Sequence, residues 1–340
     1  MQRNIAVISL TNIRKNTKKI RALIGNGVKL FSVVKANAYG HGLIPVGQAV
    51  EPLCDGLIVT DVSEGIALRT AGIFKDILVL TPPLDIEDVY FAAMHGLIVT
   101  VCNFSSYRLA EEGAIQFGIT VRAHLKINTG MNRLGLCGIP LKKLCKRAKE
   151  GGHVRIEGAY SHLYAPQNER ETTLQRERFL RERETVKRYF PDSLFHLAAS
   201  GGILRGREYF FDGVRAGILL YGYTPSGFIN DGYRPAMKVY THAMQTHRFT
   251  GGGVGYAKAE KKYGNLTAYS VGYADGFLRE GNNFSTVGNL CMVASIRRGK
   301  AVYGRKKLLF ADAEKVAKQA GTIPYEVLCA ATRRAYFEYR

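Results

Sequence analysis

Eight short apolar segments recur along the first two thirds of the chain, and this recurrence constrains the fold more than any other feature. Each segment has the length and the β-branched content of a buried strand. The segments between them have residue patterns that are compatible with helices. Eight strand-then-helix units over about 220 residues are typical of a closed parallel barrel rather than an open sheet. The predicted strands are residues 29–35, 56–60, 76–80, 96–101, 121–127, 155–163, 194–200 and 212–222.

Two of the intervening segments carry specific helix signals. Residues 63–72 begin with Ser63, a residue type that often caps helix N-termini. Residues 171–190 place apolar side chains at helical spacing. The sequence therefore predicts an α/β fold that begins with an N-terminal (β/α)8 barrel of the TIM type.

The residue pattern changes after Gly222. Glycine-rich turns and alternating Tyr and Val residues follow, which is typical of a mostly antiparallel β domain. Near the end, residues 312–321 predict a short helix closed by Gly321, and residues 322–329 predict a strand. We expect two domains, the barrel over residues 1–230 and a C-terminal β domain over residues 231–340.

Composition narrows the class of protein. Hydrophobic residues make up 46% and charged residues 22% of the 340 residues, as in an ordinary globular protein. The first residues lack the pattern of a leader peptide, and no stretch reaches the roughly 18 apolar residues of a membrane span. The six cysteines form no C-x-x-C pair, which favours reduced thiols and argues against a metal site. We therefore expect a soluble cytoplasmic protein.

The formal net charge is +20, and basic clusters occur at 142–147, 176–183, 297–300 and 304–307. Such clusters could bind polyanions, or they could be solvated faces of helices and turns. Because they are dispersed and no recognised nucleic-acid motif accompanies them, we do not expect a nucleic-acid partner.

Basic and polar side chains gather at the carboxyl ends of the predicted strands. In a barrel these ends face the active site, although charged residues also occur there simply because strand ends contact water. A lysine that is partly desolvated among cations has a lowered pKa and can form an imine with a carbonyl compound. The residues concerned are Lys35, Lys126, Arg133, His162, Ser200 and Arg215.

Glycines follow the first of these lysines and also the seventh strand. Gly40, Gly42 and the turn "ASGG" at 199–202 would let backbone N–H groups approach a phosphate. An aldehyde together with a phosphate indicates pyridoxal 5'-phosphate as the cofactor.

The motif "VVKANAYGHG" around Lys35 resembles the cofactor-lysine motif of the alanine racemase family, and further segments match that family in its own order. They are "LKINTGMNRLG" (125–135), "EGAYSHL" (157–163), "HLAASGG" (196–202), "VRAGILLYG" (214–222), "GYA" (255–257), "VGYADGF" (271–277), "CM" (291–292) and "AGTIPYE" (320–326). The resemblance covers nearly the whole chain. It implies a homodimeric pyridoxal-phosphate isomerase that interconverts L- and D-alanine, and D-alanine supports peptidoglycan synthesis in bacteria.

The resemblance also implies roles for individual residues. Lys35 would bind the cofactor and act as one catalytic base, while Tyr256 of the partner subunit would be the second base, assisted by His162. Arg215 would face the pyridine nitrogen, and because arginine keeps its proton, that nitrogen would stay unprotonated. The phosphate would be held by Tyr39, Ser200, Gly217, Ile218 and Tyr325.

The remaining roles concern the substrate. Arg133 would reach the cofactor phenolic oxygen and the substrate carboxylate, and Met292 would also contact substrate. Lys126 resembles a lysine that the family can carbamylate. Tyr273 and Arg279 would line the access route.

The chain departs from the family pattern in its second domain. Asn289 and Val293 stand where the family has an arginine and an aspartate, and the segments on both sides of Cys291 are short. Two alternatives to an alanine racemase follow: a racemase of other or broader amino-acid specificity, or a weakly active pyridoxal-phosphate-binding paralogue.

Overall fold

The computed structural model describes residues 3–254, 257–258, 264–277, 293–297 and 301–340. The chain divides into two compact units, one of residues 14–36 and 46–233 and the other of residues 1–13, 37–45 and 234–340. Residues 1–13 and 37–45, which the sequence places with the barrel, therefore belong to the second unit.

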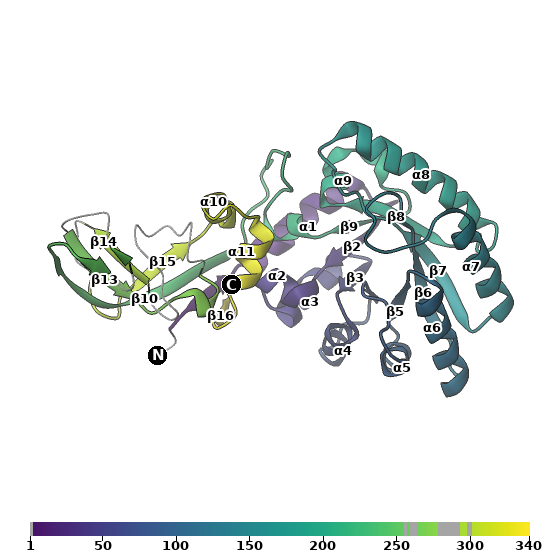
Figure 1. The fold of residues 1–340 in the computed structure, drawn as a ribbon, viewed down its shortest axis with the longest axis horizontal. Helices are drawn as coiled ribbons and strands as arrows, with labels where there is room; N and C mark the ends of the chain where they lie inside the picture. Colours follow the sequence, from purple (N-terminus) through teal and green to yellow (C-terminus); the bar gives the residue numbers. More distant parts are fainter. Residues whose placement is uncertain (1–2, 255–256, 259–263, 278–292, 298–300) are drawn as a thin grey trace. The chain divides into compact units, whose positions relative to one another are not determined.

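The first unit contains a closed barrel of eight parallel strands, which confirms the predicted fold class. Figure 1 shows these strands surrounded by helices. The strands are β2 (Lys29–Val33), β3 (Gly56–Val59), β4 (Asp76–Val79), β5 (Ile98–Val101), β6 (Val121–Lys126), β7 (Val154–Tyr160), β8 (Leu194–Ala199) and β9 (Gly213–Ala216). The barrel closes where β2 pairs with β9.

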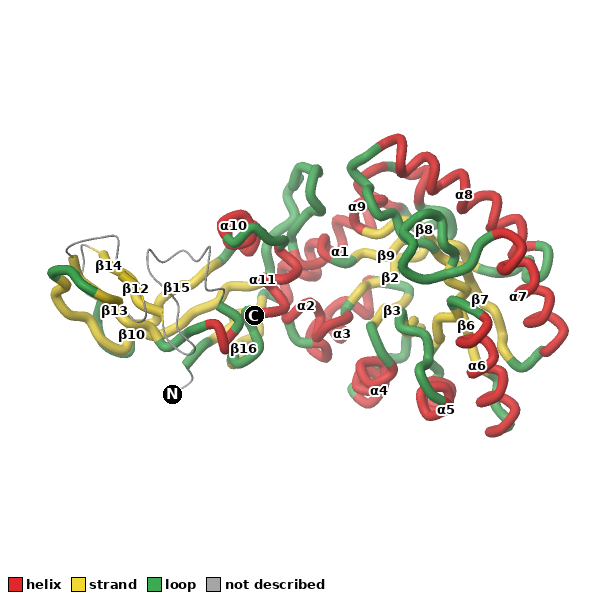
Figure 2. The backbone as a smooth tube through the Cα atoms, viewed as in Figure 1, coloured by secondary structure: helices red, strands yellow, loops and turns green. Residues whose placement is uncertain are grey.

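Helices lie outside the strands, as the alternation of red and yellow segments in Figure 2 makes visible. They are α1 (Leu10–Ile24), α2 (Lys35–Gly40), α3 (Leu43–Val50), α4 (Val62–Thr70), α5 (Ile86–Met94), α6 (Phe104–Phe117), α7 (Gly138–Gly151), α8 (Glu169–Lys187) and α9 (Ser200–Arg205). The strand side chains that form the core are almost entirely buried, for example Leu57, Ile58 and Leu78.

The prediction that Ser63 caps its helix is wrong. Asp61 is the N-cap of α4, and its side chain accepts a hydrogen bond from Glu64 N. Because α4 begins at Val62, Ser63 already lies inside its first turn, where the Ser63 hydroxyl donates a hydrogen bond to the Asp61 carboxylate at 2.7 Å.

The second unit is built on a six-stranded sheet in the order β14-β13-β10-β1-β16, with β15 pairing β10. Its strands are β1 (Ile5–Ile8), β10 (Met237–Phe249), β13 (Gly264–Tyr269), β14 (Val293–Arg297), β15 (Lys306–Phe310) and β16 (Tyr336–Tyr339). All pairs are antiparallel except β1 with β16. The pairing of β1 with β10 and β16 explains why the first residues of the chain belong to this unit.

Two short helices follow β15 along the chain. Residues 312–321 form the predicted helix, α10 (Ala313–Gln319). The predicted strand at 322–329 is wrong, because this segment forms helix α11 (Pro324–Ala330). Pro324 occupies the first helical turn, where its fixed φ suits a helix and its missing N–H costs nothing. In the part of the chain that the structure describes, no helix combines the length and apolar character of a membrane span.

Candidate active site at the barrel mouth

Lys35 follows the end of the first barrel strand and opens an unusual turn. β2 ends at Val33, and Lys35 is the first residue of α2. The next four residues have positive φ values, from +51° to +54°, although none is glycine. Left-handed backbone costs a non-glycine residue roughly 1–2 kcal/mol, and such strain is often found at functional sites. The strained turn therefore marks Lys35 as a candidate functional residue.

Arg215 lies on β9 and is buried with a dense set of hydrogen bonds. Its guanidinium donates to the backbone oxygens of His196 (2.8 Å), Ser161 (2.6 Å) and Leu197 (3.0 Å). It also contacts Nδ1 of His196 at 2.9 Å and Nδ1 of His162 at 3.3 Å. Burial lowers the pKa of Arg215 to about 10, so the side chain remains charged at neutral pH.

A group of buried aromatic side chains supports Arg215 from inside the barrel. The Tyr160 ring stacks on His196, with centroids 5.0 Å apart, and Nδ1 of His124 lies 3.0 Å from Nε2 of His196. Arg215 lies over the Tyr160 ring at 5.3 Å. None of these three residues was predicted from the sequence as a site residue. A histidine within the otherwise apolar strand "LFHLAAS" was the available signal for His196.

His162 follows β7 and lies among cations. Its pKa is well below its ordinary value, first because of burial and then because of Arg215, Lys126, Arg133 and Lys35. The four basic residues predicted at the strand ends therefore all lower the pKa of one imidazole. A neutral imidazole in such surroundings can accept a hydrogen bond from Arg215 and donate one elsewhere.

Lys126 ends β6 and is 5% exposed. Its Nζ lies 4.9 Å from the centroid of the Tyr160 ring. Burial, followed by repulsion from Arg215 and Arg133, lowers the pKa of Lys126 to about 7. Lys126 is thus an amine that is substantially uncharged at neutral pH.

The candidate phosphate ligands of the barrel unit come from two neighbouring strand ends. Ser200 opens α9 after β8, and Ile218 opens a short 3-10 helix (Ile218–Tyr221) after β9. Ser200 Oγ accepts a hydrogen bond from Gly217 N at 3.1 Å. The hydroxyl of Tyr221 donates to Val33 O at 2.9 Å, which ties this segment to the strand that precedes Lys35.

The remaining predicted site residues belong to the β-rich unit or lie outside the described residues. Tyr39 and Tyr325 are neighbours, with ring centroids 5.6 Å apart, and burial raises the pKa of Tyr325 to about 12. Tyr273 is 47% exposed, and Val293 begins β14. Four further residues singled out by the resemblance lie outside the described residues: Tyr256, Arg279, Asn289 and Met292.

The chemistry of the barrel mouth fits pyridoxal phosphate. An amine follows one strand end, and the groups that lower the pKa of His162 are all basic side chains, which suits a ligand with a phosphate and a substrate with a carboxylate. Within the described ranges, no group of three or more His, Cys, Asp or Glu residues could hold a metal ion. The residues present therefore match an anionic cofactor that binds covalently to an amine.

A parallel eight-stranded barrel with a lysine at its cationic mouth defines a pyridoxal-phosphate enzyme of the barrel type. The family model described as "Alanine racemase, N-terminal domain" matches residues 8–225, and that for "Alanine racemase, C-terminal domain" matches residues 236–339. The chain belongs to the alanine racemase family.

Similar proteins extend over almost the entire chain. The alanine racemase of Streptococcus uberis is 32% identical over an alignment that covers 96% of this chain and 94% of the relative. The solved alanine racemase of Clostridium difficile 630 has a TM-score of 0.91 at 27% identity and covers 100% of this chain and 96% of that one. The structure from Bartonella henselae, with covalently bound pyridoxal phosphate, has a TM-score of 0.88 at 26% identity and covers 100% of both chains.

Proposed function

We propose that this protein interconverts L-alanine and D-alanine with pyridoxal phosphate as its cofactor. The single observation that carries the proposal is the match of both family domains to a chain whose barrel mouth gathers Lys35, His162 and Arg215. When it is bound, pyridoxal phosphate stabilises negative charge at the α-carbon of an amino acid. The protein's own part is to hold this group and to move one proton on each face of that carbon.

Lys35 holds the cofactor and moves the proton on one face. Arg215 would face the pyridine nitrogen and, because arginine keeps its own proton, would leave that nitrogen unprotonated. By keeping that nitrogen unprotonated, Arg215 would disfavour transamination and favour return of the proton to the α-carbon. Ser200, Gly217 and Ile218 bind the phosphate, together with Tyr39 and Tyr325 of the β-rich unit.

Tyr256 moves the proton on the opposite face and comes from the partner subunit of a homodimer. A phenol has an unperturbed pKa of about 10, so it needs assistance to act as a base at neutral pH. His162, which accepts a hydrogen bond from Arg215, gives that assistance.

Arg133 and Met292 bind the substrate, and Tyr273 and Arg279 line its access route. Tyr325 beside the substrate methyl group excludes longer side chains, which favours alanine. Lys126 is a candidate for carbamylation, and as a carbamate it would be an anion able to orient Arg133. The protein acts in the cytoplasm, where D-alanine supports peptidoglycan synthesis.

A chiral assay of the purified protein tests this proposal. L-alanine is supplied with and without added pyridoxal phosphate, and L-serine and L-lysine are assayed beside it. D-alanine should form, and Lys35→Ala should abolish its formation while the matched variant Lys29→Ala, at the exposed start of β2, should not. Faster racemisation of serine or lysine would favour the broader racemase, and cofactor binding without turnover would favour the paralogue.

The cofactor lysine can be identified directly. Borohydride reduction of the holoenzyme followed by peptide mapping should place the pyridoxyl group on Lys35. A label on another lysine would contradict the assignment of Lys35.

A further inference from the structure

Gln175 is a buried polar residue on the inward face of α8. This face is formed by Thr172, Gln175, Phe179 and Val186, which follow helical spacing and are at most 1% exposed. An apolar side chain would pack at such a position without loss of hydration, whereas a buried amide is costly unless its polar atoms are bonded. The hydrogen bonds of Gln175 therefore indicate its role.

The side-chain amide of Gln175 makes three hydrogen bonds to loops at the barrel mouth. Nε2 donates to the carbonyl oxygen of His162 at 3.0 Å and to Thr129 Oγ1 at 3.1 Å. Oε1 accepts from Tyr164 N at 3.1 Å. The orientation of the amide is unambiguous, because the His162 carbonyl can only accept and the Tyr164 N–H can only donate.

These bonds connect two loops that carry candidate site residues. Thr129 lies between Lys126 and Arg133 in the loop after β6, and its hydroxyl is 2.8 Å from Ser161 Oγ in the loop after β7. The carbonyl of Ser161 accepts from Arg215 at 2.6 Å. One side chain of α8 thus supports a network that extends to three strand ends.

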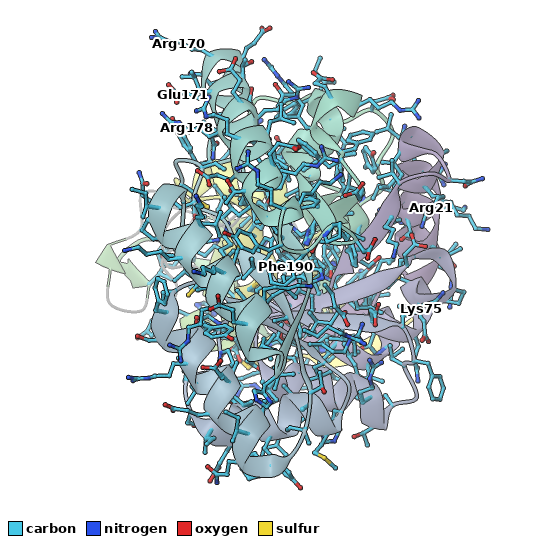
Figure 3. All side chains as sticks on the ribbon, turned by 90° about the vertical axis from the view of Figure 1, so that its right-hand side faces the viewer. Arg21, Lys75, Arg170, Glu171, Arg178 and Phe190 are labelled. Carbon is cyan, nitrogen blue, oxygen red and sulfur yellow. The ribbon has the colours of Figure 1, made fainter. Side chains whose placement is uncertain are left out.

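Arg178, one turn further along α8, makes a second contact with the same loop. Its guanidinium donates to Thr129 O at 3.1 Å. Figure 3 labels Arg178 with Arg170 and Glu171 on this helix. Arg178 is exposed, so Gln175 is the buried one of the two α8 contacts.

We propose that Gln175 is a positioning residue that holds the loops carrying Arg133 and His162 in the arrangement needed for racemisation. The first part of this proposal is that Gln175 holds the two loops in place. The second part, that racemisation needs this arrangement, rests on the proposed function. An amide is suited to this task because it donates twice and accepts once from a single rigid plane. Support of this kind determines whether the groups at a site are held closely enough to the geometry that the reaction requires.

Amide hydrogen exchange of the cofactor-free protein tests the first part without any assay of activity. Gln175→Met removes all three bonds, and exchange in residues 128–136 and at Tyr164 should become about tenfold faster or more. Gln175→Glu keeps the acceptor for Tyr164 N and loses both donated bonds. It should therefore accelerate exchange in residues 128–136 while Tyr164 stays protected.

Phe179→Leu is the matched control. Phe179 is fully buried on the same face of α8 and packs on Phe195 and Phe211, at centroid distances of 6.3 and 4.9 Å. Its replacement should loosen the core without selective exchange in the two loops. Equal exchange in Gln175→Met and Phe179→Leu would overturn the proposal.

Steady-state kinetics of the holoenzyme test the second part. At saturating alanine and cofactor, Gln175→Met should lower kcat by about 10- to 100-fold, whereas Phe179→Leu should change it by less than a few-fold. Loosened loops with an unchanged kcat would overturn the positioning role. If the parent protein does not racemise alanine, the proposed function fails, and the exchange experiment still decides whether Gln175 holds the loops.

Discussion

Arg215 donates a hydrogen bond to Nδ1 of His196 across 2.9 Å inside the barrel. Because a guanidinium can only donate, Nδ1 of His196 must be an acceptor, and the proton of the neutral ring lies on Nε2. Nε2 then donates to Nδ1 of His124 at 3.0 Å. Burial lowers the pKa of both histidines, for His124 to about 4. Among the hydrogen-bonded residues Arg215, His196 and His124, only Arg215 is therefore charged at neutral pH.

Arg215→Lys should lower both stability and racemisation. A lysine ammonium has three donors on a flexible stem and cannot reproduce the fork that serves three backbone carbonyls. Leaving buried acceptors without a donor costs about 1–3 kcal/mol each. We expect urea unfolding to show a loss of that order or more, and racemisation to fall at least about tenfold.

Arg108→Lys on the surface of α6 is the control, since the Arg108 side chain is 69% exposed and forms an ion pair with Glu112 one turn further along the same helix. Equal stability of the two variants would contradict the structural role assigned to Arg215.

The stability of the folded protein should fall in acid because of its buried histidines. Burial lowers the pKa of His124 from 6.5 to about 4, so between these pH values the unfolded chain binds a proton that the folded chain does not. The free energy of unfolding therefore falls as pH decreases from about 6.5 to about 4, by up to about 1.4 kcal/mol per pH unit for one such group.

His124→Asn should remove this contribution, because the Asn oxygen can still accept from His196 but does not titrate. Urea unfolding from neutral pH down to about pH 4.5 measures the slope. Replacement of the exposed His153 by Asn serves as the control. An unchanged slope in His124→Asn would show that folding does not lower the pKa of His124.

Some features of the fold and site were predictable from the sequence, and others depended on tertiary contacts. The eight barrel strands were predictable because parallel strands that are buried on both faces are nearly continuous apolar runs. The segment "TIPYEVLC" has the β-branched and aromatic residues of a strand, yet Pro324 at its helical start and packing of Val327 and Leu328 favour α11. Local propensity is weak enough for such contacts to decide.

In the candidate site, too, some features were predictable from the sequence and others were not. Lys35 and Arg215 were predictable because they follow or occupy strands whose ends must meet. The left-handed turn after Lys35 was not, since only Asn37 among its four residues is of a type that favours positive φ. Gln175 could have been noticed as a polar residue in an apolar helical stripe, but its partners become apparent only once the loops are placed.

Ala36→Gly should stabilise the protein. Ala36 is exposed and has φ +53°, a conformation that glycine adopts without the steric cost imposed by Cβ. We expect the free energy of unfolding to rise by about 0.5–1 kcal/mol, after allowing for the greater entropy of glycine in the unfolded chain.

Ala22→Gly is the opposite control, because Ala22 is exposed within right-handed α1 and its replacement should destabilise by about 1 kcal/mol. If both variants lost stability equally, the turn after Lys35 would not be strained.

Lys126→Met should stabilise the unmodified protein at neutral pH. The folded protein releases the Lys126 proton near pH 7, since burial lowers its pKa from 10.5 to about 7, whereas the unfolded chain keeps it until about pH 10.5. The cost of the buried charge is therefore fully present below pH 7 and decreases as pH rises from 7 towards 10.5. We expect a gain of about 1–3 kcal/mol near pH 6 and a smaller gain near pH 9.

The measurement is urea unfolding in buffer freed of carbon dioxide, repeated with added bicarbonate. A carbamate at Lys126 is an anion among Arg215 and Arg133, so its loss in Lys126→Met would destabilise the protein. Destabilisation that depends on bicarbonate would support the carbamate, and destabilisation without bicarbonate would contradict the buried-charge argument.

The two proposed bases are Lys35 and Tyr256 of the partner subunit. If each base serves one side of the same α-carbon, each should exchange the α-proton of mainly one enantiomer with solvent. Lys35 would serve D-alanine and Tyr256 would serve L-alanine. Tyr256→Ala should therefore lose solvent exchange from L-alanine far more than from D-alanine, by at least about 100-fold as for loss of a general base.

Mixing two inactive variants tests whether the second base is supplied by the partner subunit. A heterodimer of Lys35→Ala and Tyr256→Ala chains contains one site with both bases and one site with neither, so part of the racemase activity should return after subunit exchange. Mixed isotopic labelling and native mass spectrometry establish that exchange has occurred. If heterodimers form and activity stays absent, or if Tyr256→Ala racemises alanine as fast as the parent, Tyr256 of the partner is not the second base.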